Sequence, residues 1–387
     1  MTPHQSKIEK LIAQLCPNGV EFKELGELVN ILDSQRSPVT REKREIGEVP
    51  YYGANGIQSY VKDYIFDGTF LLMGEDGSVI NKDGSPVLNW VSGRIWVNNH
   101  AHILSEIKDK ALLRYIYFSL QKTDVTKLVR GTPPKLNQQS LRGIKIPLPP
   151  IAIQEEIVTI LNSFTELEAE LEAELEAREK QYEHYRLELL MFGEGIEWNT
   201  LSEVAHFMNG KGHEKHIDEN GKYIVVNSKF VSTEGRVKKY SVKQISPVSK
   251  NDLLMVMSDL PNGKALAKCF YVDENDKYTL NQRICALTVK NNEKINAKFL
   301  FYILNRNKQL LRYDSGADQT NLRKDDILEI KIPVPSIAEQ ERIVKILDKF
   351  DALVNDISIG LPAELSARRL QYEYYRGKLL TFNEYAK

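Results

Sequence analysis

The feature that most constrains this chain is an internal repeat. The segment IKIPLPPIAIQEEIVTILNSF begins at Ile144, and IKIPVPSIAEQERIVKILDKF begins at Ile330, 186 positions later. QYEHYRLELLMF from Gln181 then corresponds to QYEYYRGKLLTF from Gln371, at an offset of 190. The second copy has therefore gained four residues, which is about one helical turn.

The repeat also extends upstream. GVEFKELGEL from Gly19 aligns with GIEWNTLSEV from Gly195, and NNHAHIL from Asn98 aligns loosely with NQRICAL from Asn281. The chain thus consists of two halves, each a globular stretch followed by the repeated segment. Its 387 residues, 42% hydrophobic and 27% charged, suit a folded protein of two or more domains.

Each repeated segment is predicted to form a long amphipathic helix. After Pro150, apolar residues recur in alternating steps of four and three, with one extra step of four in the first copy and two in the second. Such a seam must be buried, and the simplest partner of each helix is its own copy, which predicts an intramolecular coiled coil. A helical hairpin within an ordinary core is the alternative. The expected packing positions are Ile157, Phe164, Leu171, Tyr182 and Tyr185 in the first copy and Ile343, Phe350, Ile357, Tyr372 and Tyr375 in the second.

Two local features mark these helices. ELEAELEAELEA, from Glu166 to Ala177, is three identical tetrapeptides with an acidic face, typical of a spacer that varies by whole units. One unit lengthens a helix by roughly 6 Å, which corresponds to about one to two base pairs of DNA. In the second copy the extra turn holds Gly360 and Pro362, so we expect a kink or restart with Pro362 near a new first turn.

The two globular stretches predict α+β domains. Each is rich in Tyr, Val, Ile and Gly at strand-like spacing with turn signals between, as in VPYYGANGIQSYVKDYIFDGTFLLMGEDGSVI. KALLRYIYFSLQKTD and NAKFLFYILNRNKQLLRYD, near the ends of the two stretches, are predicted to be amphipathic helices. We expect globular domains over 1–150 and 193–335, and the repeated helices over 151–192 and 336–387.

Charge is segregated along the chain, which has 52 Lys and Arg against 53 Asp and Glu. Residues 155–179 hold nine acids and one base, so the remainder is modestly basic. This distribution is compatible with nucleic-acid binding by the globular domains, although it does not require it.

The chain is expected to be cytoplasmic. Its apolar runs are short, and the start MTPHQSKIEK lacks the apolar stretch of a secretory signal. Cys16, Cys269 and Cys285 lack the spacing of a metal or redox motif, so we expect them to be buried and reduced.

No catalytic motif is recognisable in the sequence. It lacks an Asn-Pro-Pro-aromatic motif for amino methylation, a GxxxxGK[ST] phosphate loop and a Pro-Asp…ExK nuclease pair. HEKH, from His213 to His216, resembles a zinc motif, but its histidines are at i,i+3 in a Gly- and Lys-rich loop instead of i,i+4 on a helix. We expect no metal site and no catalytic residue, and we expect this loop to face DNA.

Three features together resemble the specificity subunit of type I restriction-modification systems: GANGI from Gly53, the two boundary segments at Ile144 and Ile330, and the two QYE-YYR helix ends. The resemblance covers essentially the whole chain, in order and twice. It implies that each half is a target recognition domain for one part of a split DNA sequence, the first following an N-terminal arm, and that the two helices pair antiparallel as a ruler.

The same resemblance implies the partners. The helices would bind two modification subunits, which carry S-adenosylmethionine and methylate adenine, and through them restriction subunits that use ATP and Mg²⁺. The chain itself would be non-catalytic, would bind no cofactor, and would have double-stranded DNA as its ligand.

Candidate DNA contacts are polar positions beside the predicted strands and turns, because Arg and Lys suit guanine and phosphate while Asn and Gln suit adenine. In the first domain they are Tyr52, Asn55, Gln58, Asn98, Asn99, His100, Lys135 and Asn137. In the second they are Asn209, Lys211, His213, Asn227, Lys229, Asn281, Gln282, Arg283, Asn321 and Arg323. TPPKLNQ from Thr132 and DQTNLRK from Asp318 occupy equivalent places in the two halves.

Each candidate also has a structural interpretation. Asn55 can simply form a hairpin turn, because Asn-Gly is a strong turn signal. One of His100 and His102, which alternate on a strand, can be a hydrogen-bonded core residue. The other positions can be solvated surface.

Two other functions fit the same features. The chain could be a coiled-coil scaffold whose domains bind proteins, or a stand-alone DNA-modification enzyme. Salt-dependent binding to duplex DNA separates the first from a DNA reader, because phosphate contacts release counterions. Methylation of adenine by the purified chain would identify the second.

Overall fold

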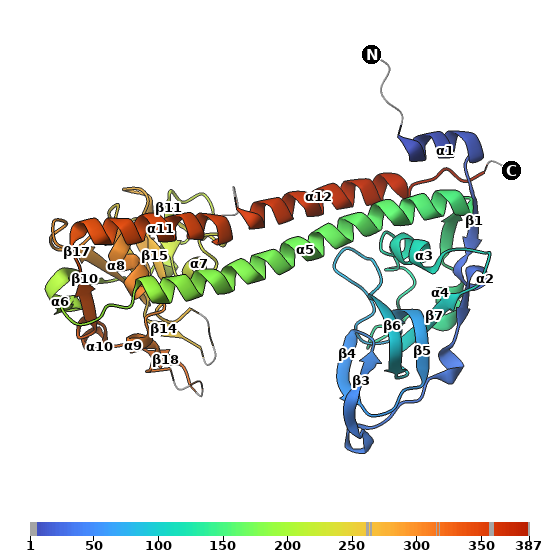
Figure 1. Ribbon diagram of the computed structural model, residues 1–387, viewed down its shortest axis with the longest axis horizontal. Coiled ribbons are helices and arrows are strands. Elements are labelled where there is room, and N and C mark those ends of the chain that lie inside the picture. The colour runs from blue at the N-terminus through green and yellow to red at the C-terminus, as the bar shows by residue number, and fades with distance from the viewer. Residues whose placement is uncertain are drawn as a thin grey trace, which may run out of the picture. The chain divides into compact units, whose positions relative to one another are not determined.

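The computed structural model describes residues 6–260, 263, 265–314, 316, 318–355 and 360–385. The chain divides into two compact units (Figure 1). Unit 1 comprises Met1–Ala173 and Ala363–Lys387, and unit 2 comprises Glu174–Pro362. Helix α5 (Ile151–Leu189) therefore begins in unit 1 and ends in unit 2.

Unit 1 is built on a six-stranded sheet with the order β2-β7-β5-β6-β3-β4. β3 runs parallel to β6, and the other neighbours are antiparallel. Leu71 and Met73 of β5 join one apolar cluster and Leu72 joins another, so both faces of this strand are covered. The strands of the sheet are β2 (Val29–Ile31), β3 (Ile46–Gly53), β4 (Gly56–Val61), β5 (Phe66–Gly74), β6 (Leu88–Val97) and β7 (Ala101–Glu106).

Short helices and a separate strand pair complete unit 1. β1 (Glu21–Glu24) pairs antiparallel with β8 (Lys145–Leu148). This pair joins the repeated segment GVEFKELGEL to the repeated boundary segment that begins at Ile144. The helices are α1 (Lys7–Leu15), α2 (Leu25–Leu28), η1 (Asp33–Gln35), η2 (Arg41–Lys43), α3 (Leu113–Leu120) and α4 (Gln138–Arg142).

Unit 2 contains two smaller sheets, with the orders β10-β17-β13-β15 and β12-β11-β16. The strands β14 and β18 form a separate pair. β11 runs parallel to β16, as β3 does to β6 in unit 1. The strands are β10 (Ala205–Asn209), β11 (Tyr223–Val226), β12 (Tyr240–Ser241), β13 (Leu253–Val256), β14 (Ser258–Asp259), β15 (Cys269–Tyr271), β16 (Tyr278–Leu280), β17 (Ile284–Val289) and β18 (Thr320–Asn321).

In unit 2 the two repeated segments also form a strand pair, as they do in unit 1. β9 (Glu197–Thr200) is antiparallel to β19 (Lys331–Val334). The repeat therefore encodes a strand pair that closes each globular part and leads into a long helix. The helices of unit 2 are α6 (Leu201–Val204), η3 (Glu214–His216), α7 (Ser228–Ser232), α8 (Ala297–Leu304), α9 (Lys308–Leu311), α10 (Lys324–Leu328) and α11 (Ile337–Asn355). Both units are α+β, as predicted.

In unit 1, α12 (Leu361–Leu379) packs along the first part of α5 (Figure 1). The ring of Phe164 stacks on Tyr375 with centroids 5.5 Å apart and lies 6.2 Å from Tyr372. Arg369, earlier in α12, bonds to Glu168 at 2.6 Å, later in α5. Within this unit the two helices therefore run antiparallel.

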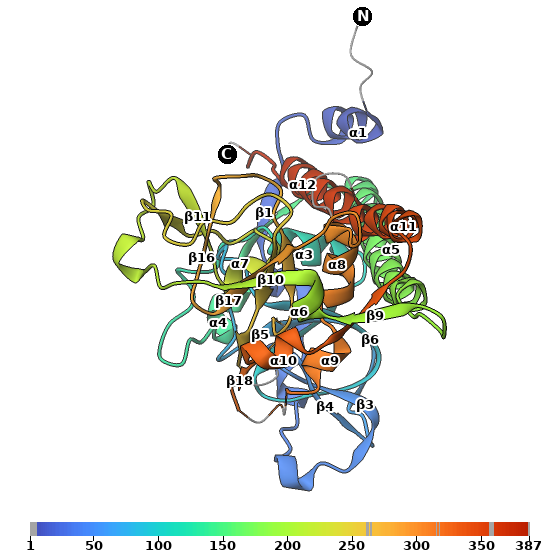
Figure 2. The same cartoon turned by 90° about the vertical axis from the view of Figure 1, so that its left-hand side faces the viewer.

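In unit 2, α11 lies beside the end of α5 in both views (Figure 1 and Figure 2). Phe350 contacts two rings of α5, with centroids 5.5 Å from Tyr185 and 6.4 Å from Tyr182. Tyr182 is buried by these contacts, whereas Tyr185 remains partly exposed.

The other predicted packing positions have mixed outcomes. Ile157 and Ile343 are buried in the cores of units 1 and 2 respectively, and Leu171 is half-buried. Ile357 lies outside the described residues. The predicted restart is confirmed, because α12 begins at Leu361 and places Pro362 in its first turn.

Candidate nucleic-acid interface

In unit 1, backbone hydrogen bonds bring together predicted contact residues from separate segments. The N–H of Glu75 donates to the carbonyl of His100, and the N–H of Leu136 donates to the carbonyl of Glu75, both at 2.8 Å. The N–H of Asn98 donates to the carbonyl of Tyr52 at 3.0 Å. The segments around Tyr52, 98–100 and 135–137 therefore meet at the end of the sheet.

Unit 2 contains the same backbone arrangement with different side chains. The N–H of Met257 donates to the carbonyl of Arg283 at 3.0 Å, and the N–H of Leu322 donates to the carbonyl of Met257 at 2.8 Å. The N–H of Asn281 donates to the carbonyl of Val226 at 3.1 Å. These bonds match the alignments of Asn98 with Asn281 and of TPPKLNQ with DQTNLRK, which the sequence supports only weakly.

The β3–β4 hairpin and the segment after β6 present the exposed polar groups of unit 1. Asn55 lies exposed at the hairpin tip, where Gly56 adopts a φ of +96°. Asn99 and His100 are exposed, and His100 Nδ1 contacts the carboxylate of Asp76. The remaining exposed candidates of this unit are Gln58, Lys135 and Asn137, while Tyr52 is half-buried.

In unit 2 the exposed candidates lie on or next to the segments that correspond to the contact segments of unit 1. Gly210 and Lys211 donate backbone hydrogen bonds to Ile284 and Leu280, which holds the loop after β10 beside 281–284. The exposed positions are Asn209, Lys211, Lys229, Gln282, Arg283, Asn321 and Arg323, and Asn227 and Asn281 are half-buried.

Two predicted contacts are wrong, because their side chains are buried and hydrogen-bonded within the protein. Asn98 is 3% exposed. Its amide oxygen accepts from the N–H of His100 at 2.8 Å, and its amide nitrogen donates to Gln58 at 3.2 Å. His213 is 0% exposed and bonds to the Lys211 carbonyl and the Thr279 hydroxyl, both at 2.7 Å. These two residues hold neighbouring loops in place.

Other candidates have a structural role as helix caps. Asn137 caps α4 by accepting the N–H of Ser140 at 2.8 Å, and Asn227 caps α7 by accepting the N–H of Phe230 at 2.9 Å. Arg323 occupies the equivalent position before α10. Asparagine at a helix start is favoured for this capping bond irrespective of function.

The structure also indicates residues that sequence reasoning missed. Asp76 contacts His100, and Gln319 donates to Ser258 at 2.8 Å and to Asn321 at 3.4 Å. A surface hollow in unit 2 is lined by Tyr313, Gln319 and other polar side chains of this segment. Gln319 belongs to DQTNLRK and lies two positions before the predicted contact Asn321. Its place in this segment could therefore have identified it from the sequence.

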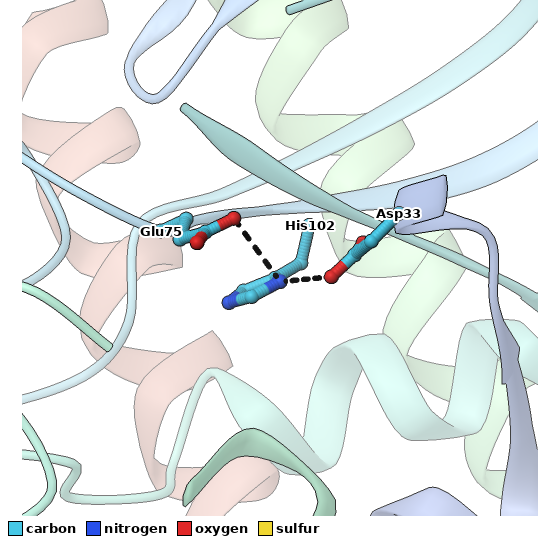
Figure 3. Close-up of side chains that lie close together, drawn as sticks. All are labelled: Asp33, Glu75 and His102. Carbon is cyan, nitrogen blue, oxygen red and sulfur yellow. Dashed lines mark hydrogen bonds and ion pairs between the residues drawn. The ribbon is translucent and has the colours of Figure 1, made fainter. Parts of the chain in front are cut away.

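Unit 1 also contains a group of buried and half-buried ionisable residues, and Figure 3 shows three of them, Asp33, Glu75 and His102. We call Asp33, Arg36, Glu75 and His102 the charged cluster. His102 is fully buried, with Nδ1 2.6 Å from Asp33 Oδ2 and 3.7 Å from Glu75 Oε2. Nε2 lies 2.8 Å from the Leu136 carbonyl. His102, and not His100, is therefore the hydrogen-bonded core histidine of the pair.

The charged cluster is an ion-pair network. Burial raises the pKa of Asp33, but the hydrogen bond from His102 and the positive charges of His102 and Arg36 bring that pKa below its usual value. The Leu136 carbonyl can only accept a hydrogen bond, so His102 Nε2 carries a proton and donates to it.

The composition of this cluster also suits a metal, since ligand-type atoms of Asp33, Glu75 and His102 lie within 4.8 Å of one another. However, Arg36 and Lys135 already supply positive charge to these carboxylates. Both ring nitrogens of His102 are occupied by hydrogen bonds. The residues therefore fit an ion-pair network better than a metal site.

Among the helices that the structure describes, none is both long and apolar enough to cross a membrane.

Comparison with known proteins identifies the family. The family model described as "Type I restriction modification DNA specificity domain" matches residues 17–177 and again 194–367. A Haemophilus influenzae protein described as a type I restriction enzyme specificity subunit is 33% identical over 99% of this chain and 100% of its own length. The EcoR124I/EcoR124II specificity subunit of Escherichia coli is 36% identical over 71% of this chain and 72% of its own length.

Solved structures show the same fold at low sequence identity. The type I restriction-modification S subunit from M. genitalium is 18% identical and superposes with a TM-score of 0.61, covering 94% of this chain and 96% of that one. The chain therefore belongs to the family of type I restriction-modification DNA specificity subunits, with one DNA specificity domain in each half.

Proposed function

We propose that this chain reads a bipartite DNA target, with unit 1 and unit 2 each reading one half-site, and that it performs no chemistry itself. It would bind two modification subunits and, through them, restriction subunits. It would hold no cofactor, while S-adenosylmethionine would reside in the modification subunits and ATP and Mg²⁺ in the restriction subunits. We propose that it works in the cytoplasm.

The shared backbone arrangement of the two units carries this proposal. In both units, the same backbone hydrogen bonds hold three segments together, but the exposed side chains differ. Asn99, His100 and Lys135 in unit 1 correspond to Gln282, Arg283 and Asn321 in unit 2. Amide and cationic side chains are the groups that distinguish adenine and guanine in the major groove. Recognition of two different half-sites requires different base-contacting side chains, and here one shared backbone arrangement carries them.

The helix pairs support the second part of the proposal. The antiparallel contacts of α12 with α5 in unit 1, and the contacts of Phe350 with α5 in unit 2, are those expected of a coiled coil that separates two readers. Two copies of one helix also offer two similar docking surfaces, as two identical modification subunits would need.

The decisive experiment is to express the chain with the modification subunit of its own system and to map methylated adenines across the host genome. A split motif with a fixed non-specific gap is the expected result. A complex that assembles and methylates at no shared motif would overturn the proposal in favour of a protein-binding scaffold.

Two simpler measurements address the alternatives. Binding of the purified complex to duplex DNA should weaken steeply with salt, because each neutralised phosphate releases counterions. The purified chain alone should not methylate adenine when supplied with S-adenosylmethionine. Methylation without partners would identify a stand-alone enzyme instead.

A further inference from the structure

We propose that the charged cluster positions the DNA-reading segments of unit 1, so that Asp33 and Glu75 determine the specificity of one half-site without touching DNA. This inference rests on the proposed function. It assigns Asp33, Glu75 and His102 as positioning residues, a role that the motifs of the chain do not indicate.

Arg36 connects the cluster to the segment that carries Asn99 and His100. Its Nη1 donates to Glu75 Oε2 at 2.5 Å, to the Ala101 carbonyl at 2.9 Å and to the Asn99 carbonyl at 3.4 Å. Through Arg36, the position of the exposed residues after β6 is tied to the half-buried carboxylate of Glu75.

His102 and Asp33 connect the cluster to the segment that carries Lys135. His102 Nε2–H donates to the Leu136 carbonyl at 2.8 Å, and Gln138 Nε2 donates to Asp33 Oδ2 at 3.0 Å. Lys135 Nζ itself lies 3.2 Å from Glu75 Oε1. One buried network therefore fixes two segments that are about 35 residues apart in sequence.

Unit 2 shows that the backbone frame does not need these charges. Strand pairing places His102 opposite Met73 in unit 1 and Cys285 opposite Met255 in unit 2. The matching backbone hydrogen bonds place Met257 at the position that Glu75 occupies in unit 1. At these two positions unit 2 therefore has uncharged, sulfur-containing side chains, and Cys285 is fully buried.

This contrast identifies what the charges contribute. Burying charges costs desolvation energy, so an ion-pair network often contributes less stability than well-packed apolar residues of similar size. Hydrogen bonds between charged groups are directional and short, and they fix the positions of the groups they join. We infer that the cluster serves the geometry of the interface more than the stability of the fold.

The test uses Asp33→Asn and Glu75→Gln, which keep side-chain shape but remove charge. Each variant is made in the full chain, expressed with the modification subunit, and used for genome-wide mapping of methylated adenine. Glu24→Gln is the matched control, because it removes an exposed carboxylate of unit 1 that pairs with Lys145 at 3.2 Å outside the interface.

We expect both variants to accept additional bases in one half-site, with discrimination at one or more positions falling about tenfold, a typical value for one well-aligned base contact. The other half-site and the gap should stay unchanged and serve as an internal control. Glu24→Gln should methylate the wild-type motif.

The remaining outcomes separate the two hypotheses. If the wild-type complex gives no split motif, the proposed function fails. If the wild-type motif is split and both variants reproduce it unchanged, the positioning role is wrong. If both variants lose methylation at all sites and melt at a lower temperature, the cluster holds the fold together and the inference is likewise overturned.

Discussion

The buried side-chain oxygen of Gln154 accepts a hydrogen bond from the backbone N–H of Leu112 at 3.0 Å. Its amide nitrogen donates to the Pro149 carbonyl at 2.8 Å. Gln340 makes the same pair of bonds in unit 2, to the N–H of Asn296 and the Pro335 carbonyl, both at 2.8 Å. The glutamine of the repeated boundary segment thus fixes the start of each long helix to the start of α3 in unit 1 and of α8 in unit 2.

Replacing Gln154 with Ala should lower the stability of unit 1 by about 1–3 kcal/mol, because it removes the partner of the half-buried Leu112 N–H and of the buried Pro149 carbonyl. Hydrogen exchange of peptides from both units would locate the loss to unit 1. Glu155→Ala, at the next and exposed position, is the control and should change little. An equal effect of the two substitutions would contradict this role of Gln154.

Unit 2 should lose stability as the pH falls below about 6.5, the usual pKa of histidine. Burial lowers the pKa of His213 in the folded protein. In this pH range the unfolded chain binds a proton that the folded chain does not, so protonation favours unfolding. Denaturation midpoints measured between pH 5 and 8 should show this slope.

His213→Asn should flatten that slope at some cost in overall stability, since it removes the titrating ring and its two hydrogen bonds. The control is His206→Asn, because the side chain of His206 is exposed. A slope that persists in His213→Asn would show that another group is responsible.

The stability of the α5–α12 contact in unit 1 should depend on its aromatic side chains more than on its ion pairs. Phe164→Ala should cost about 2 kcal/mol, less than for a fully buried phenylalanine because the ring is only half-buried. Arg369→Ala removes exposed ion pairs with Glu168 and Glu172 and should cost less than about 1 kcal/mol, a cost that high salt reduces further. Chemical denaturation at two salt concentrations distinguishes these contributions, and the reverse ranking would argue for an electrostatic pairing.

Deleting Glu174–Ala177, one ELEA unit, should change the gap of the methylated motif by about one to two base pairs while both half-sequences stay the same. Four residues are close to one helical turn, so the orientation of the attached domains changes little. Methylation mapping measures both the gap and the half-sites.

The matched control for this deletion keeps the length and removes the charge. Glu174→Gln with Glu176→Gln abolishes the exposed pairs with Arg178 and Lys180 but should leave the gap unchanged. Altered half-sequences after the deletion would refute the idea that α5 sets a distance.

The sequence by itself determined the two-half organisation, the α+β class of both domains and the restart at Pro362. Repeats, turn signals and proline positions are local features, and local geometry is enough to interpret them. The same kind of signal placed Asn55 at a hairpin tip, because Asn-Gly favours the turn that joins two adjacent strands.

Only the tertiary structure decided which polar residues face outward. Asn98 and His213 carry the same functional groups as the exposed Asn99 and His100, and neither spacing nor residue type distinguishes them. Their side chains bond to Gln58 and Thr279, which lie 40 and 66 residues away. The charged cluster likewise joins Asp33 to His102 across 69 positions. Such long-range contacts form only when the sheet brings its strands together, so no local pattern records them.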